Sequence, residues 1–182
     1  HNDNRRLYIL DSVDSTNNYA KELARNGESG GTVVISDMQT AGKGRMGRSF
    51  CSPPKSNIYM SIILRPEMDI ESSQLITSCV AAAAASAIDT ICGTDTQIKW
   101  VNDLFLNGKK ICGILTEASV SFESGTLDFA VVGIGINVRS VVNVFPEELL
   151  KTATSIQDET EKLFDRSEII AEVITSVEKY LN

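Results

Sequence analysis

An Asn-Gly turn between two apolar runs constrains the fold of this chain more than any other feature. Leu104-Phe105-Leu106 precedes Asn107-Gly108, and a second run from Lys109 to Leu115 follows. Asn-Gly favours the type I′ turn, whose twist matches that of two antiparallel strands. The sequence therefore predicts a β-hairpin at this point.

The rest of the chain supplies further strands and a few helices. A second hairpin is expected to turn at Glu123-Ser124-Gly125 and to return through Leu127–Ile136. The order of elements is rich in hairpins, so it favours an α+β fold with a mixed, mainly antiparallel sheet over alternating β-α units. Strands are expected at Leu7–Leu10, Thr32–Ser36, Asn57–Leu64 and Gln97–Trp100, and helices at Thr16–Arg25, Ser72–Ile91, from Phe145-Pro146-Glu147-Glu148, and at Arg166–Leu181.

Composition excludes several classes of function. The chain has 182 residues, enough for one domain with a sizeable core, and its formal net charge of −7 argues against a general nucleic-acid binder. We find no apolar stretch of about 20 residues and no signal peptide, so we expect no membrane span and a cytoplasmic protein. The four cysteines show no C-x-x-C spacing, which makes a zinc site an unfavourable interpretation.

The near absence of histidine further limits the catalytic mechanisms that this chain could use. His1 is the only histidine, and it lies at the very start of the sequence. Histidine acid–base catalysis is therefore effectively excluded. Any catalysis is expected to use Lys, Arg, Asp, Asn or a bound metal.

One loop, Gln39–Phe50, concentrates positive charge in this acidic chain. Gly42, Gly44 and Gly47 alternate with cations, and backbone N–H groups exposed at glycines form anion-binding concavities. The segment nearly fits both the G-x-G-x-x-G dinucleotide motif and the P-loop. Both need a helix to follow, and Pro53-Pro54 stands there instead. A solvated basic turn is the alternative interpretation.

Two further segments carry polar groups or glycines within apolar patterns, Asn102-Asp103 with Lys110 and Gly133–Asn137. If these segments meet the loop in the fold, phosphates or a carboxylate could be bound by Lys43, Arg45, Arg48 and Lys110. Asp103 could hold Mg²⁺. Asn102 and Asn137 could bind a base, and Phe50 could stack on one. A carboxylate attacks an α-phosphate once charges are neutralised and groups aligned, so this inventory indicates activation of an acid by adenylation.

Taken together, these blocks resemble the biotin protein ligases. The resemblance covers nearly the whole chain in order, and it implies a fold similar to class II aminoacyl-tRNA synthetases. It also implies that biotin and MgATP give biotinyl-5′-AMP, and that the biotinyl group then passes to a lysine of a biotin carboxyl carrier protein domain. The matching blocks are Ser15-Thr16-Asn17, Gln39–Arg48, Lys99–Leu104, Lys110–Leu115 and Gly133–Asn137.

The resemblance also implies roles for individual residues. Lys110 and Arg45 would be catalytic, holding the biotin carboxylate and the phosphate that it attacks. Asp103 would carry Mg²⁺ with ATP. Biotin would be bound by Ser15, Thr16, Asn17, Gln39, Gly42, Lys43, Gly44, Arg45, Lys110, Gly113 and Leu115, and the nucleotide by Arg45, Arg48, Phe50, Asn102, Asp103 and Asn137.

This chain departs from the family pattern at several positions. Lys43 and Met46 stand where many members have Arg, Phe50 where an adenine-stacking Trp is common, and Val101 where Pro is usual. By resemblance we expect one catalytic domain, residues 1–182, without an N-terminal DNA-binding module and without the small C-terminal β-barrel. The expected partners are biotin, ATP and the carrier domain, with no nucleic acid and no membrane. Members of the family often form homodimers through sheet edges, so a homodimer is possible here too.

Three alternatives remain open at this point. A lipoate-protein ligase would use a related fold and the same adenylation logic. A non-catalytic module that senses biotin or a nucleotide would bind ligand without releasing pyrophosphate. An acidic scaffold with a solvated glycine loop would show no ligand effect on melting.

Overall fold

The β-hairpin expected at Asn107-Gly108 is confirmed. The computed structural model describes residues 6–68, 72–120 and 126–181. In it β5 (Asp103–Leu106) pairs antiparallel with β6 (Lys109–Val120). The turn residues have φ of 50° and 80°, as a type I′ turn requires.

This hairpin is part of one larger sheet. Seven strands in the described residues follow the order β1-β2-β3-β7-β6-β5-β4. Among these described strands, β1 and β2 are the only neighbours that pair in parallel, and the other neighbouring pairs are antiparallel. The expected mixed, mainly antiparallel sheet is therefore confirmed. The other strands are β1 (Leu7–Leu10), β2 (Val33–Ser36), β3 (Ile58–Leu64), β4 (Gln97–Lys99) and β7 (Leu127–Ile136).

Two expectations about strands need comment. The second hairpin is present as the antiparallel pair β6 and β7, while its expected turn at residues 123–125 lies outside the described residues. The strand expected over Gln97–Trp100 ends one residue early. Trp100 lies in a turn with 77% of its surface exposed, and just after this turn the Asn102 carbonyl accepts a hydrogen bond from Ile114 N.

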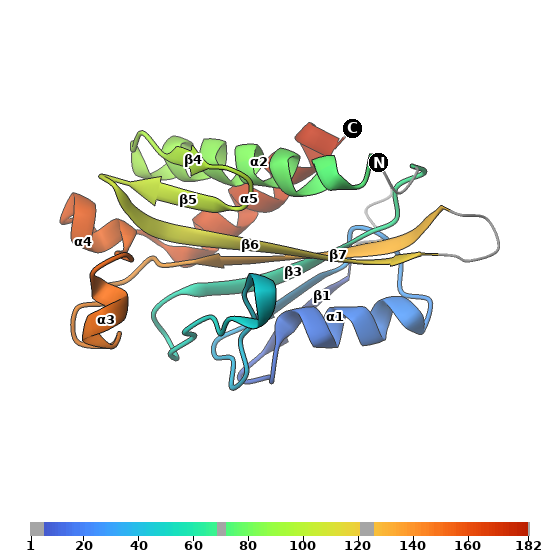
Figure 1. Ribbon diagram of the computed structural model, residues 1–182, viewed down its shortest axis with the longest axis horizontal. Helices are drawn as coiled ribbons and strands as arrows, with labels where there is room; N and C mark the ends of the chain where they lie inside the picture. Colours follow the sequence, from blue (N-terminus) through green and yellow to red (C-terminus); the bar gives the residue numbers. More distant parts are fainter. Residues whose placement is uncertain (1–5, 69–71, 121–125, 182) are drawn as a thin grey trace.

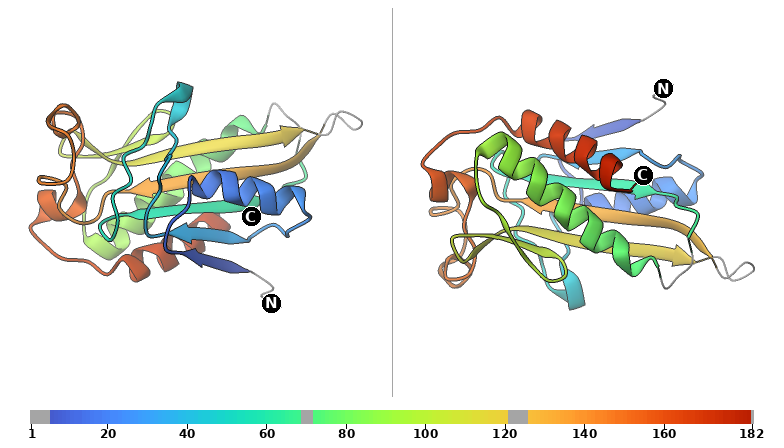
Figure 2. Two further views of the ribbon diagram at one scale, coloured as in Figure 1. Left: turned by 90° about the horizontal axis from the view of Figure 1, so that it is seen from below. Right: turned by 90° about the horizontal axis from the view of Figure 1, so that it is seen from above.

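Helices cover both faces of the sheet (Figures 1 and 2). One face carries α1 (Thr16–Arg25), and the other carries α2 (Gln74–Cys92) and α5 (Arg166–Leu181), which pack against each other. Two short helices, α3 (Glu147–Leu150) and α4 (Ile156–Thr160), lie beyond the end of β7. α4 has no counterpart in the sequence prediction.

The largest core lies between the sheet and the pair α2 and α5. β3 is buried on both faces from Ile58 to Ile63, because it is a central strand with helices above and below. The alanine run of α2 lets this helix approach the sheet closely, and Ala81, Ala83 and Ala84 have no exposed surface.

One helical segment bears on the expectation that nothing in the chain spans a membrane. Leu75–Cys92 is long and apolar enough to cross one, by length and composition alone. Half of this segment is buried inside the protein, against β-strands and α5, as in the core helix of a soluble domain. The same apolar character thus serves the core of this fold.

The close contact of α2 makes its alanines sensitive to added volume. We expect Ala84→Leu to lower the free energy of unfolding by about 1–3 kcal/mol, because three extra carbons must enter a filled core. Ala82→Leu, on the half-buried side of the same run, is the matched control and should cost less. Urea denaturation of both variants measures the difference, and equal losses would contradict this packing.

Candidate functional site

Glycines of the two central strands expose the sheet backbone on the α1 face. Gly113 of β6 lies opposite Gly135 of β7, and Gly133 lies opposite Leu115. A Cβ atom on Gly135 would stand 2.5 Å from the Phe50 ring, and one on Gly113 would stand 3.1 Å from Lys110 Nζ. These glycines are therefore the floor on which Phe50 and Lys110 rest.

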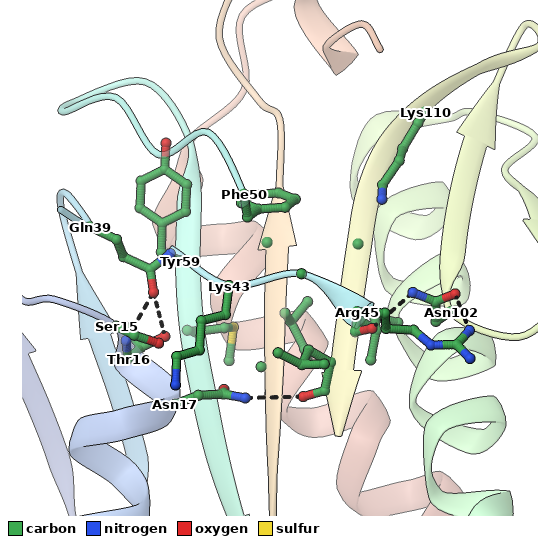
Figure 3. Close-up of a pocket in the computed structure, with 18 residues that line it drawn as sticks. Ser15, Thr16, Asn17, Gln39, Lys43, Arg45, Phe50, Tyr59, Asn102 and Lys110 are labelled. Atoms are coloured by element: carbon green, nitrogen blue, oxygen red, sulfur yellow. Dashed lines mark hydrogen bonds between the residues drawn. The ribbon is translucent and has the colours of Figure 1, made fainter. Parts of the chain in front are cut away.

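The start of α1 forms one wall of the site (Figure 3). Gln39 Oε1 accepts hydrogen bonds from Thr16 N at 2.9 Å and from Thr16 Oγ1 at 3.1 Å. Ser15 is the N-cap residue, yet its side chain makes no capping bond. Ser15 is only 1% exposed.

Asn17 builds the same wall, but its carboxamide is already engaged. Its Nδ2 donates to Leu115 O at 3.2 Å and to Glu117 Oε2 at 2.9 Å, while Ser61 Oγ donates to its Oδ1 at 2.7 Å. Burial alone would raise the pKa of Glu117, but hydrogen bonds from Lys21 and Asn17 outweigh that effect, so this pKa lies below its usual value. Asn17 thus shapes the pocket by staying fixed.

Neither Ser61 nor Glu117 was expected at the site. Both lie in strands and contact Asn17 across 44 and 100 residues of sequence. Ser61 did leave a signal, since it is a single polar residue in the apolar run of β3. A hydroxyl in such a fully buried position needs a partner, and that partner lies in the site.

The opposite wall carries charge. Lys110 Nζ and Asp103 Oδ1 form an ion pair, with 2.8 Å between these atoms. The two groups are not aligned for a hydrogen bond, so the buried Asp103 Oδ1 has no hydrogen-bond donor among the described residues. The backbone of Lys110 is fixed on both sides, because its N–H donates to Thr152 O and its carbonyl accepts from Thr154 N, each at 2.9 Å. A short segment after α3 therefore holds this lysine in place.

Asn102 is fixed next to this ion pair. Its Oδ1 accepts from Arg45 Nη1 at 2.9 Å, and its Nδ2 donates to Ile114 O at 3.2 Å. In return, Ile114 N donates to Asn102 O at 2.8 Å. Asn102 thus connects the basic loop to strand β6.

The basic loop folds as a small hairpin over the site. Gly44 N donates to Arg48 O and Phe50 N donates to Gly42 O, and the single 3-10 turn η1 (Arg45–Gly47) forms its tip. Gly42 is essential to this fold, because a Cβ atom there would stand 2.5 Å from Phe50 O. The cations of the loop diverge from one another, and Arg48 is exposed.

Two pockets adjoin under this loop. The narrow one has a cavity volume of about 50 Å³ and lies between α1 and the glycines, with Met60, Leu115 and Ile134 on its floor. The wide one, of about 760 Å³, opens toward α3. Ser15, Thr16, Asn17, Gln39 and Lys43 line the narrow pocket alone, Arg48, Lys99, Asp103, Asn137 and Phe145 the wide pocket alone, and Gly44, Arg45, Phe50, Asn102 and Lys110 line both.

Asn137 and Phe50 were both expected to meet a nucleotide base. Asn137 is 4% exposed, donates from Nδ2 to Thr154 O at 2.9 Å, and leaves its buried Oδ1 without a donor within the described residues. Phe50 lies where the two pockets join, with its ring edge toward Tyr59. The wide pocket is thus lined by a residue with an acceptor that has no donor and by one aromatic ring, and base binding stays a prediction.

The donor set limits what kind of metal could bind here. Among residues 6–68, 72–120 and 126–181, no three His, Cys, Asp or Glu side chains gather as metal ligands. Asp103 offers a single carboxylate in the wide pocket, with one oxygen free of hydrogen bonds among the described residues. That arrangement fits Mg²⁺ carried in by phosphates, which usually takes one or two protein carboxylates.

Comparison with known proteins identifies similar chains. The model of the biotin/lipoate A/B protein ligase family matches residues 9–137. The bifunctional ligase/repressor BirA of Bacillus subtilis is 40% identical over 175 residues, which are 96% of this chain and 53% of that protein. A biotin–[acetyl-CoA-carboxylase] ligase of Paracoccus denitrificans is 34% identical over 165 residues, 89% of this chain and 67% of that protein.

Solved structures agree with these relatives. The biotin protein ligase from Aquifex aeolicus in complex with biotin and ATP superposes with a TM-score of 0.80 at 30% identity, covering 97% of this chain and 70% of that one. The chain spans about half the length of the first curated relatives that it matches.

The tight fit of Asn17 against β7 can be tested directly. A Cβ atom on Gly133 would stand 2.3 Å from Asn17 Oδ1, and that carboxamide cannot move without losing its bonds to Ser61 and β6. We expect Gly133→Ala to lower the free energy of unfolding by about 1–3 kcal/mol. Gly30→Ala, where a Cβ meets only ordinary contacts, is the control. Similar denaturation curves for the two variants would refute the fit.

Proposed function

The chain belongs to the biotin/lipoate A/B protein ligase family, and from this premise we propose that it is a biotin protein ligase. In the proposed first step, biotin and MgATP give biotinyl-5′-AMP and pyrophosphate. In the second step, the biotinyl group passes to a lysine of a carrier domain. The observation that carries the proposal is the charged wall shared by the two pockets, where Lys110 and Arg45 lie.

That shared wall suits the meeting of two anions. A biotin carboxylate in the narrow pocket and an α-phosphate in the wide pocket repel each other in the absence of countercharge. Lys110 and Arg45 supply two positive charges at the junction, and a preorganised charge there lowers the barrier without reorganising at the moment of reaction. Lys110 is held in place by its ion pair with Asp103 and by its backbone hydrogen bonds to Thr152 and Thr154.

The first step needs no proton transfer. A carboxylate oxygen of biotin bonds to the α-phosphorus while the bond from that phosphorus to the bridging oxygen breaks, and pyrophosphate leaves. The carboxylate is already ionised near neutral pH. The absence of a histidine from the described site is therefore no obstacle to this chemistry.

The narrow pocket supports biotin as the acid. Donors and acceptors for a ureido group would come from the Ser15 and Thr16 hydroxyls, the Gln39 amide and the Lys43 backbone. The apolar floor suits the thiophane ring and the valeryl chain. Asn17 and the glycines keep the pocket narrow.

The wide pocket supports ATP as the second substrate. Arg48 and Arg45 would hold phosphates, and the free Oδ1 of Asn137 would accept from the exocyclic amine of adenine. Asp103 is the carboxylate that would hold a Mg²⁺ ion bound with ATP, and such an ion would neutralise phosphate charge. Asn102 orients Arg45 toward the junction.

In the second step, the amine of a carrier lysine attacks the carbonyl carbon of the mixed anhydride. An amide bond forms, the bond to the phosphate oxygen breaks, AMP leaves and a proton is released. The proposed partner is a biotin carboxyl carrier protein domain. A homodimer stays a prediction from the family.

Lys110 is the residue whose loss tests the first step. We expect Lys110→Ala to reduce biotinyl-5′-AMP formation by about 10²–10³-fold, because one charge that stabilises the transition state is lost. Lys109→Ala removes the neighbouring exposed cation of the same strand and is the matched control. Mass spectrometry after incubation with biotin, ATP and Mg²⁺ measures the adenylate. Near-normal synthesis by Lys110→Ala with an unchanged melting curve would remove this role.

The choice of acid separates this function from its nearest rival, a lipoate ligase. A dithiolane ring offers no ureido group to Ser15, Thr16 and Gln39, so we expect biotin to raise the melting temperature while lipoate at equal concentration does not. Pyrophosphate release in the presence of ATP then separates an enzyme from a ligand-sensing module. A larger stabilisation by lipoate would reject the biotin assignment.

A further inference from the structure

One cation of the basic loop is bound to α1 by a contact that the proposed chemistry does not use. Lys43 Nζ donates to Asn18 Oδ1 at 2.6 Å, and Asn18 Nδ2 donates to Asp14 Oδ2 at 2.5 Å. Asp14 lies just before the helix and Asn18 in its first turn, so the two residues are four apart on one side. The three side chains thus form a chain of hydrogen bonds at the edge of the narrow pocket.

Within this chain Asp14 sets the direction of the amide. An asparagine carboxamide has a donor end and an acceptor end, and only its oxygen can accept from an ammonium group. Because Asp14 takes the Nδ2 end, the Oδ1 end must face Lys43. The hydrogen bond from Asn18 is the largest cause that lowers the pKa of Asp14, and the positive charge of Lys43 lowers it further.

The loop has few other anchors beyond its base. Its base is bound by backbone, where Thr40 N donates to Val13 O and Ala41 N donates to Asp14 O. Its tip is not packed, since Met46 is 90% exposed. Between base and tip, Lys43 reaches the α1 wall and Arg45 reaches Asn102 on the opposite wall (Figure 3). The narrow pocket lies between these two contacts.

We propose that Asn18 is a positioning residue of the basic loop, which holds Lys43 against α1 and so keeps the loop closed over the narrow pocket. This inference rests on the proposed function, and it assigns a role to a residue outside the set that touches the ligands. Release of a bound adenylate requires the loop to open, so loss of the Asn18 contact speeds release. Because the bond is exposed, its loss is expected to raise the rate only about two- to fivefold.

The first experiment measures dissociation of biotinyl-5′-AMP in the presence of excess competing biotin. Asn18→Ala is expected to release it about two- to fivefold faster than the wild type, given the small value of an exposed contact. Asn26→Ala, an exposed asparagine at the other end of α1, is the matched control and is expected to release it at the wild-type rate. Equal rates for Asn18→Ala and Asn26→Ala would overturn the proposal.

A double-mutant cycle separates positioning from a general effect on the helix. Lys43→Met keeps the backbone and the apolar stem but removes the ammonium group. If Asn18 acts through Lys43, the double variant releases the adenylate no faster than either single variant. Lys43→Arg retains a donor and is expected to restore slow release. Effects of Asn18→Ala and Lys43→Met that multiply would overturn the proposal.

A second measurement does not depend on the proposed function. Trypsin cuts an exposed loop faster when its backbone is less restrained, and Arg45 and Arg48 are exposed. In the protein without ligand, Asn18→Ala is therefore expected to be cut after these residues faster than Asn26→Ala. Equal cleavage rates would reject the positioning role. If cleavage is faster in Asn18→Ala while the wild type fails to bind biotinyl-5′-AMP, the loop contact stands and the proposed function falls.

Discussion

The candidate site depends on a small region of the sheet where two neighbouring strands, β6 and β7, carry glycines and so present no side chains. Gly113 of β6 and Gly135 of β7 lie opposite each other, and Gly133 lies two residues before Gly135 in β7. Their bare backbone leaves room for the Phe50 ring, for Lys110 Nζ and for the Asn17 carboxamide, all of which a Cβ atom would meet at 3.2 Å or less. The loop, the lysine and the helix can converge only because the sheet itself takes up so little space there.

Local patterns were sufficient to predict most of this architecture. The Asn107-Gly108 turn, the alanine run of α2 and the apolar strands each depend on neighbours along the sequence, and the structure places them as expected. Helix α4 was missed because it is short and polar. Its start does carry a signal, since Ser155 Oγ accepts from Asp158 N at 3.0 Å in a Ser-x-x-Asp pattern.

The site was predictable in its residues but not in its contacts. Resemblance to a family selected Ser15, Gln39, Arg45 and Lys110, and the structure gathers them around two adjoining pockets. It did not show that Asn17 is already fully engaged, because its partners Ser61 and Glu117 are distant in sequence. Such contacts follow from the register of the strands, which no short motif encodes.

The segment after α3 that binds the backbone of Lys110 bears on how short a fragment of this chain could be and still keep the site intact. Thr152 and Thr154 bind the backbone of Lys110, and Thr154 O also accepts from the Asn137 side chain. Both threonines lie beyond residues 9–137, the part of the chain that the family model matches. The local fold around Lys110 therefore depends on residues beyond the matched segment. A fragment cut at residue 137 would keep that whole segment, but Lys110 would lose its backbone hydrogen bonds to Thr152 and Thr154.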